Sequence, residues 1–131
     1  MPGNLIMKTV LYVDDNDEII EIVSIVLSNS NYHLITENNS KNAINICLDK
    51  KPALVLMDIS MPDMDGFEVS KQLREKGFDN PIIILTASES AADRQKAKAA
   101  GCTDYILKTV DMQNVGQIID RYIGEAGELS A

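Results

Sequence analysis

The sequence predicts an α/β fold, a doubly wound sheet of five parallel strands with helices on both faces. Short apolar blocks recur along the chain and alternate with amphipathic stretches of helical period, which is typical of repeated strand–helix units. The 131 residues are enough for one domain with a core and too few for two. Because no repeat or linker interrupts the pattern, we expect a single domain over residues 1–131, with its core at about 8–124 and frayed ends.

Five apolar blocks are the expected strands, and they cover residues 9–13, 32–36, 53–57, 81–86 and 104–108. The second block, YHLIT, is more polar than the others, which favours a position at the edge of the sheet. Pro81 suits the first residue of a strand, where its missing N–H does little harm. Since a helical pattern separates successive blocks, the strands are expected to run parallel with right-handed crossovers.

The helical patterns have recognisable beginnings and ends. The first pattern covers residues 17–29, and Asp65 with Glu68 three residues later resembles a capping box for the third, which runs to about Lys76. The last pattern places Val115, Ile118, Ile119, Tyr122 and Ile123 at helical spacing. The other expected caps and stops are Ser40 and Pro52 for the second helix, Gly77 for the third, and Ser90, Asp93 and Gly101 for the fourth.

Composition excludes several classes of function. The formal net charge is −8 and the sequence pI about 4.5, which argues against direct binding to nucleic-acid phosphates. No apolar run approaches the roughly 18 residues that a membrane span requires, and the N-terminus lacks the apolar region of a secretory signal. Cys47 and Cys102 are too few for a disulfide framework or a metal knuckle. We therefore expect a cytoplasmic protein without membrane insertion.

Chemically active side chains follow four of the five blocks directly. Ligands of an open parallel sheet bind at the carboxyl ends of its strands, so these side chains are expected to share one rim. Three carboxylates crowded together would raise one another's pKa values, and a hard divalent cation such as Mg²⁺ relieves that repulsion. The residues are Asp14 and Asp15 after the first block, Asp58 after the third, Thr86 at the end of the fourth and Lys108 at the end of the fifth.

Such a set favours phosphoryl chemistry. A lysine and a metal offset negative charge on a transferring phosphoryl group, and a threonine hydroxyl can donate to one of its oxygens. A carboxylate can itself be the nucleophile and form an aspartyl phosphate. The sequence lacks a glycine-rich phosphate loop after the first strand, which argues against nucleotide or flavin binding.

Four segments carry a resemblance to a known family. In order along the chain they are YVDDN, LVLMDISMPDMDGFE, LTAS and AAGCTDYILK, within residues 8–124. Together they resemble the response-regulator receiver domain of two-component signalling and phosphorelay systems, of the chemotaxis-regulator type. The resemblance implies a flavodoxin-like sheet of strand order 2-1-3-4-5 with five helices.

The resemblance also implies roles for the residues at the rim. Asp58 is then the phosphoacceptor, Asp15 and Asp58 with the backbone carbonyl of Ser60 hold Mg²⁺, and Asp14 acts mainly through a metal-bound water. Thr86 and Lys108 would contact the phosphoryl group. The further assignments are Pro62 and Gly66 as residues that shape the loop, Tyr105 as an aromatic switch that acts with Thr86, and Ser60 and Ser88 as positions that tune the lifetime of the phosphoryl group.

Some of these residues have ordinary structural explanations. Tyr105 could be plain packing, Thr86 could simply end a strand, and Asp63 and Asp65 are expected to shape and cap the loop after Asp58. Thr109 stands where the family usually has a cis proline, and a cis bond to a non-proline residue costs about 2.5–4 kcal/mol. We therefore expect a trans bond between Lys108 and Thr109, or a strained cis one.

The functional hypothesis is a signalling switch that catalyses only its own phosphorylation and slow dephosphorylation. The donor would be a histidine kinase or a histidine phosphotransfer protein. The output surface would be the face of the fourth helix, the fifth strand and the fifth helix. Two alternatives are a pseudo-receiver that only docks partners and a Mg²⁺-dependent phosphatase that passes through an aspartyl phosphate. The chain could be a stand-alone receiver or a piece of a larger regulator.

Overall fold

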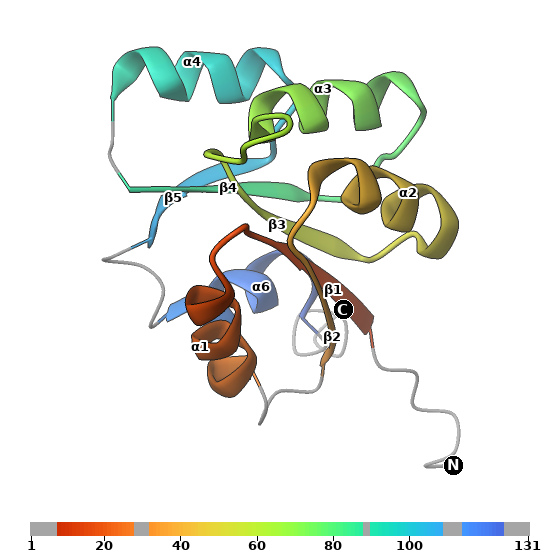
Figure 1. Ribbon diagram of the computed structural model, residues 1–131, viewed down its shortest axis with the longest axis vertical. Helices are drawn as coiled ribbons and strands as arrows, with labels where there is room; N and C mark the ends of the chain where they lie inside the picture. The colour runs from red at the N-terminus through yellow and green to blue at the C-terminus, as the bar shows by residue number, and fades with distance from the viewer. Residues whose placement is uncertain (1–7, 28–31, 88–89, 109–113, 125–131) are drawn as a thin grey trace.

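The computed structural model describes residues 8–27, 32–87, 90–108 and 114–124, and these form a five-stranded parallel sheet (Figure 1). The strand order is β2-β1-β3-β4-β5, as the sequence predicts. Each pair of neighbouring strands is parallel. The strands are β1 (Lys8–Val13), β2 (Tyr32–Glu37), β3 (Leu54–Asp58), β4 (Ile82–Thr86) and β5 (Asp104–Leu107).

Helices cover both faces of the sheet (Figure 1). One face packs against α1 (Asp17–Leu27) and α6 (Val115–Ile123). The other face packs against α2 (Ser40–Lys50), α3 (Gly66–Glu75) and α4 (Ala91–Ala99). These five helices correspond to the five helical patterns of the sequence, so the predicted fold class is confirmed. None of the described helices is long and apolar enough to cross a membrane.

The core lies in two layers because strand side chains alternate between the faces of the sheet. In β3, Leu54 and Leu56 belong to the layer under α1 and α6, whereas Val55 and Met57 belong to the layer under α2, α3 and α4. All four side chains are completely buried. Burial on both faces explains why the central strands read as continuous apolar runs in the sequence.

Two of the predicted helix caps are confirmed and one is wrong. Asp65 Oδ1 accepts from the Glu68 backbone N–H at 2.9 Å, and Ser90 Oγ accepts from the Asp93 backbone N–H at 3.1 Å. The cap of α2 is Asn39 and not Ser40, since the extended backbone of Asn39 lets its side chain accept from the Asn42 N–H at 3.0 Å. Ser40 is instead the first helical residue, and its buried hydroxyl donates to the Met64 carbonyl at 2.7 Å.

The predicted stops of α3 and α4 are also confirmed. Gly77 and Gly101 have φ values of 93° and 84°, a left-handed conformation that glycine adopts without a steric penalty. Helix α2 ends at Lys50, two residues before Pro52, as expected. Four predictions lie outside the described residues: the Lys108–Thr109 bond, the role of Ser88, the end of the first helix at residues 28–29 and the frayed ends of the chain.

Candidate functional site

The carboxyl ends of four strands line one cavity of about 430 Å³. It opens where β1, β3, β4 and β5 end, which is the edge of the sheet that the strand-end residues predicted. All the predicted metal and phosphoryl-contact residues lie in its wall, whereas Tyr105, Pro62 and Gly66 do not. The lining residues are Asp14, Asp15, Asn16, Asp58, Ile59, Ser60, Thr86, Ala87, Asp93 and Lys108.

Strand alternation explains why three of these side chains converge. Asp14, Asp58 and Lys108 come two positions after Tyr12, Leu56 and Ile106, which all belong to the layer under α1 and α6. The Lys108 ammonium lies between the two carboxylates, with Nζ 2.7 Å from Asp14 Oδ2 and 3.3 Å from Asp58 Oδ1. Lys108 therefore bridges the ends of β1 and β3 from the end of β5.

Asp14 is buried although its carboxylate is ionisable, and three donors hold it in place. Its side chain is completely buried, its Oδ1 accepts from the Asn16 backbone N–H at 2.9 Å, and its Oδ2 accepts from the Tyr12 hydroxyl at 2.7 Å. With the bond from Lys108, the carboxylate has three donors. A buried carboxylate is stable only when it is paired and hydrogen-bonded in this way.

Asp15 is exposed, whereas Asp14 and Asp58 are buried, and the three carboxylates lie close together. One oxygen each of Asp14, Asp15 and Asp58 lies within 4.8 Å of the other two. Carboxylate oxygens at such spacing are the ligands that Mg²⁺ prefers, and an open cavity leaves room for the waters that Mg²⁺ retains. The donor set therefore fits a hard divalent cation.

The electrostatics of the site centre on Asp58. Burial and the neighbouring charge of Asp14 raise the pKa of Asp58 to about 6, although the Lys108 ammonium and the Ser60 backbone N–H act in the opposite direction. Burial by itself would lower the pKa of Lys108, but its bonds to Asp14 and Asp58 outweigh burial and raise that pKa. At neutral pH the site thus holds an ionised Asp58 beside a fully charged lysine.

Thr86 and Tyr105 lie toward the other face of the sheet. Thr86 follows Ile84 by two positions, and Ile84 and Tyr105 both belong to the layer under α2, α3 and α4. Tyr105 is 7% exposed, and the Arg94 guanidinium of α4 lies over its ring at 5.2 Å from the centroid. The two residues that the sequence proposes as a switch therefore lie on the α4 side of the sheet, whereas Asp14, Asp58 and Lys108 lie on the side of α1 and α6.

The loop between β3 and α3 packs directly against Asp58. A Cβ atom on Gly66 would lie 2.6 Å from the Asp58 carbonyl oxygen, so only glycine fits there. The Gly66 N–H donates to the Ile59 carbonyl at 2.9 Å. The loop is also held from α2, because Asp63 Oδ1 accepts from the Ser40 N–H at 3.4 Å. Although desolvation opposes the change, hydrogen bonds from Ser40 and nearby backbone groups lower the pKa of Asp63.

Three residues at the site were missed by the sequence interpretation. Tyr12 donates to Asp14, Asn16 supplies a backbone donor to the same carboxylate and caps α1 with its side chain, and Asp93 lines the cavity from α4. The signal for Tyr12 was its place two residues before Asp14, since alternate residues of an extended strand share a face. Nothing comparable in the sequence marks Asp93, because its position depends on the packing of α4.

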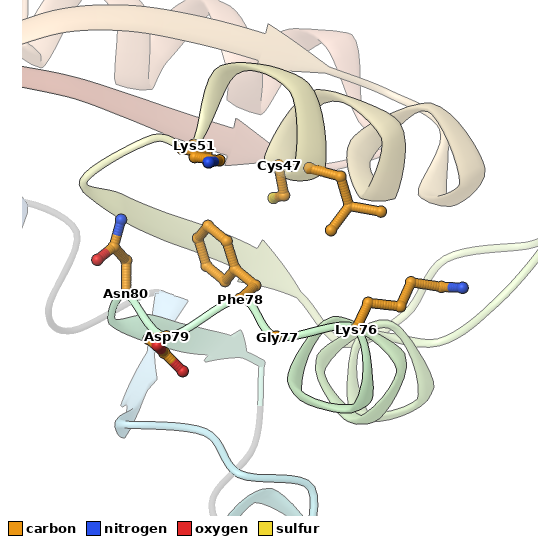
Figure 2. Close-up of a pocket in the computed structure, with 8 residues that line it drawn as sticks. Cys47, Lys51, Lys76, Gly77, Phe78, Asp79 and Asn80 are labelled. Atoms are coloured by element: carbon orange, nitrogen blue, oxygen red, sulfur yellow. The ribbon is translucent and has the colours of Figure 1, made fainter.

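A second cavity of about 400 Å³ lies away from this site, beside the ends of α2 and α3 (Figure 2). Figure 2 shows Cys47 on the α2 side, Phe78 on the opposite side and Lys76 pointing away. Its charged residues are Lys51, Lys76 and Asp79, so it has one carboxylate where the first cavity has a cluster. Burial raises the pKa of Cys47 to about 12, which leaves its thiol unreactive. Of these two cavities, only the first brings together carboxylates that could hold a cation.

The fold and site define a response-regulator receiver domain. Residues 10–120 match the family described as response regulator receiver domain, and the chain belongs to that family of two-component signalling proteins. It is 33% identical over 108 residues to the alkaline phosphatase synthesis transcriptional regulatory protein PhoP of Bacillus subtilis, in an alignment that covers 82% of this chain and 45% of that protein.

Other relatives match the chain over almost their whole length. The polar-differentiation response regulator DivK of Brucella anthropi is 30% identical over 121 residues, which is 91% of this chain and 98% of that protein. The chemotaxis protein CheY4 of Vibrio cholerae superimposes with a TM-score of 0.84 at 28% identity, covering 90% of this chain and 100% of that one. The chain spans less than half the length of PhoP and of some other relatives.

Proposed function

We propose that this chain is a phosphoacceptor switch in which Asp58 takes a phosphoryl group from a phosphohistidine in a Mg²⁺-dependent reaction. The observation that carries the proposal is the bridge from Lys108 to Asp14 and Asp58 inside a cavity that also contains Asp15 and Thr86. The donor would be a histidine kinase or a histidine phosphotransfer protein, since the chain's only histidine, His33, lies on β2 and outside the cavity wall.

In this mechanism an Asp58 oxygen attacks phosphorus, the bond from phosphorus to the donor imidazole nitrogen breaks, and the electron pair leaves with the imidazole. With a pKa of about 6, Asp58 is mostly ionised at neutral pH and needs no general base. Lys108 would then pair with a phosphoryl oxygen, and the Thr86 hydroxyl would donate to another. When bound at Asp15, Asp58 and the Ser60 carbonyl, Mg²⁺ supplies positive charge that offsets the phosphoryl oxygens.

Phosphorylation would act on the face formed by α4, β5 and α6. A phosphoryl group adds up to about two negative charges and strong acceptors beside Thr86. Movement of Thr86 toward it would free space on the side of Tyr105 and α4. The expected result is a changed docking surface for a protein target, and hydrolysis of the acyl phosphate would reset it. Ser60 is small and exposed, so we expect little shielding of the phosphoryl group from water.

The test is phosphorylation by acetyl phosphate in Mg²⁺, followed by mass spectrometry of the intact chain. We expect one phosphoryl adduct per chain, none after chelation of the metal, and none in Asp58→Asn. Asp63→Asn is the matched control, because Asp63 lies on the same loop but outside the cavity wall, and it should be labelled like the wild type. Equal labelling of Asp58→Asn would refute the assignment.

The same assay separates the two alternatives. A docking module without phosphoryl chemistry would give no adduct under any of these conditions. A phosphatase would release phosphate continuously from small phosphomonoesters, whereas a receiver should form one adduct and stop until that adduct hydrolyses.

A further inference from the structure

One oxygen of Asp14 receives hydrogen bonds from two different side chains. Asp14 Oδ2 lies 2.7 Å from the Tyr12 hydroxyl and 2.7 Å from Lys108 Nζ. Both donors compete for the electron density of one atom, because a carboxylate oxygen has about two acceptor positions. Oδ1 accepts only the Asn16 N–H among the bonds found in the described residues, so Oδ2 is the more heavily shared of the two oxygens.

The hydroxyl of Tyr12 is not needed for packing. Tyr12 is completely buried in the layer under α1 and α6, among apolar residues such as Val10, Leu54 and Leu56. A phenylalanine ring would keep all of these apolar contacts and lose only the hydroxyl. The hydroxyl is the one polar atom of the Tyr12 side chain, and it donates to Asp14. Removing it should therefore act mainly on that carboxylate.

We propose that Tyr12 is a positioning residue whose hydroxyl weakens the hold of Asp14 on Lys108 and on the metal, so that Lys108 can move to the phosphoryl group. This inference rests on the proposed phosphoacceptor function and extends it to a residue outside the cavity wall. A donor to a carboxylate disperses its negative charge, which lowers its attraction for any other cation. Tyr12 thus sets a balance between binding the metal and releasing the lysine.

The balance predicts opposite effects of one substitution. In Tyr12→Phe, Asp14 keeps its full charge for Lys108 and for the metal. Mg²⁺ should bind about threefold more tightly, while phosphorylation at saturating Mg²⁺ should be about threefold slower, the scale of a fraction of a hydrogen bond. A residue that only orients Asp14 would weaken the metal and slow the reaction together, and a residue that only fills space would change neither.

The matched control is Tyr122→Phe. It makes the same chemical change and removes another tyrosine–aspartate bond, from the Tyr122 hydroxyl to Asp104 Oδ2 at 2.5 Å, away from the cavity. Mg²⁺ affinity is measured by titration calorimetry on the unphosphorylated chain. The phosphorylation rate is measured with acetyl phosphate at saturating Mg²⁺. Tyr122→Phe should leave both quantities at wild-type values.

A second variant tests the same balance in the reverse direction. A fluorinated tyrosine placed at position 12 is a stronger donor, so Mg²⁺ should bind more weakly and phosphorylation at saturation should be faster. Unchanged or weaker Mg²⁺ binding in Tyr12→Phe overturns the inference, as does an unchanged rate. If the wild-type chain forms no adduct, the proposed function fails, and the calorimetric comparison still decides whether Tyr12 weakens cation binding at Asp14.

Discussion

Helices α3 and α4 cover the same face of the sheet but are anchored very differently. Helix α3 buries Val69 and Leu73 as well as Gly66 and Ser70, whereas Ala97 is the one buried residue within α4. Helix α3 follows the strand that ends in Asp58, and α4 follows the strand that ends in Thr86. The Asp58 side of the site is therefore fixed by apolar burial, and the Thr86 side is held by less of it.

The two ends of α4 also differ. Arg74 of α3 reaches the loop after α4, with Nε 2.9 Å from the Gly101 carbonyl and an NH group 3.4 Å from Thr103 Oγ1. At the other end of α4, the Ser90 side chain caps the helix and Arg94 lies over Tyr105. The C-terminal end of α4 is therefore held by α3, and its N-terminal half by its own cap and by contact with β5.

The largest expected effect tests the anchoring directly. Leu73→Ala removes a completely buried side chain under α3 and should lower the free energy of unfolding by about 2–5 kcal/mol. Ala97→Gly is the corresponding truncation in α4 and should cost about 1 kcal/mol, mostly through helix propensity. Both are measured by urea denaturation. Equal losses would mean that α4 is anchored as firmly as α3.

The loop after Asp58 should tolerate no side chain at its glycine. Gly66→Ala places a Cβ 2.6 Å from the Asp58 carbonyl oxygen, so the loop must shift, at a cost of about 1–3 kcal/mol. Because the shift moves Asp58, labelling by acetyl phosphate should also slow.

Gly116 in α6 provides the control for this substitution. A Cβ there meets no heavy atom within 4 Å, so Gly116→Ala should stabilise the chain by about 0.5–1 kcal/mol through helix propensity and leave labelling unchanged. If the two alanines had the same effect, tight packing of the loop would not explain the result.

The fold could be predicted from the sequence because periodicity and caps act locally. The apolar block at residues 53–57, which became β3 (Leu54–Asp58), and the cap at Asp65 depend on neighbours along the chain. The error at α2 shows the limit of this reasoning. Asn39 and Ser40 are both good capping residues. The Ser40 hydroxyl donates to the Met64 carbonyl, which is distant in sequence, and Asn39 caps the helix instead.

The site could be predicted only as a set of residues. Because strand ends meet at one rim, Asp14, Asp58 and Lys108 could be placed together in advance. Their pairing could not, since the sequence does not reveal that Lys108 lies closer to Asp14 than to Asp58. The Tyr12 bond and the Arg94 contact with Tyr105 depend on side-chain geometry across elements, which residue spacing does not encode.

A smaller effect should appear in the pH dependence of stability without metal. Burial raises the pKa of Asp58 from 3.8 to about 6, so between these values the folded chain binds more protons than the unfolded chain. Stability contributed by Asp58 is therefore lost as the pH rises from about 4 to 6. We expect a loss of about 1–2 kcal/mol after allowance for screening by solvent.

Asp58→Asn isolates this contribution, because asparagine does not titrate. The difference in unfolding free energy between the variant and the wild type should grow in favour of the variant from pH 4 to pH 7. A constant difference would show that folding does not raise the pKa of Asp58. Added Mg²⁺ should reduce the difference at pH 7.

The smallest effect concerns the contact between Arg94 of α4 and Tyr105 of β5. Arg94 is exposed on α4 and lies over the ring of Tyr105, and a cation over an aromatic face contributes about 0.5–1 kcal/mol at such a site. Arg94→Ala should cost about that much stability and should raise the exposure of Tyr105, because the guanidinium lies over the ring. A fluorinated tyrosine at position 105, observed by solvent-dependent fluorine NMR shifts, reports the exposure.

Lys98→Ala removes an exposed charge from the same helix and should leave the signal unchanged. If Arg94→Ala left Tyr105 equally shielded, α4 itself would hold the ring, and the contrast between α3 and α4 would be smaller than their buried side chains indicate.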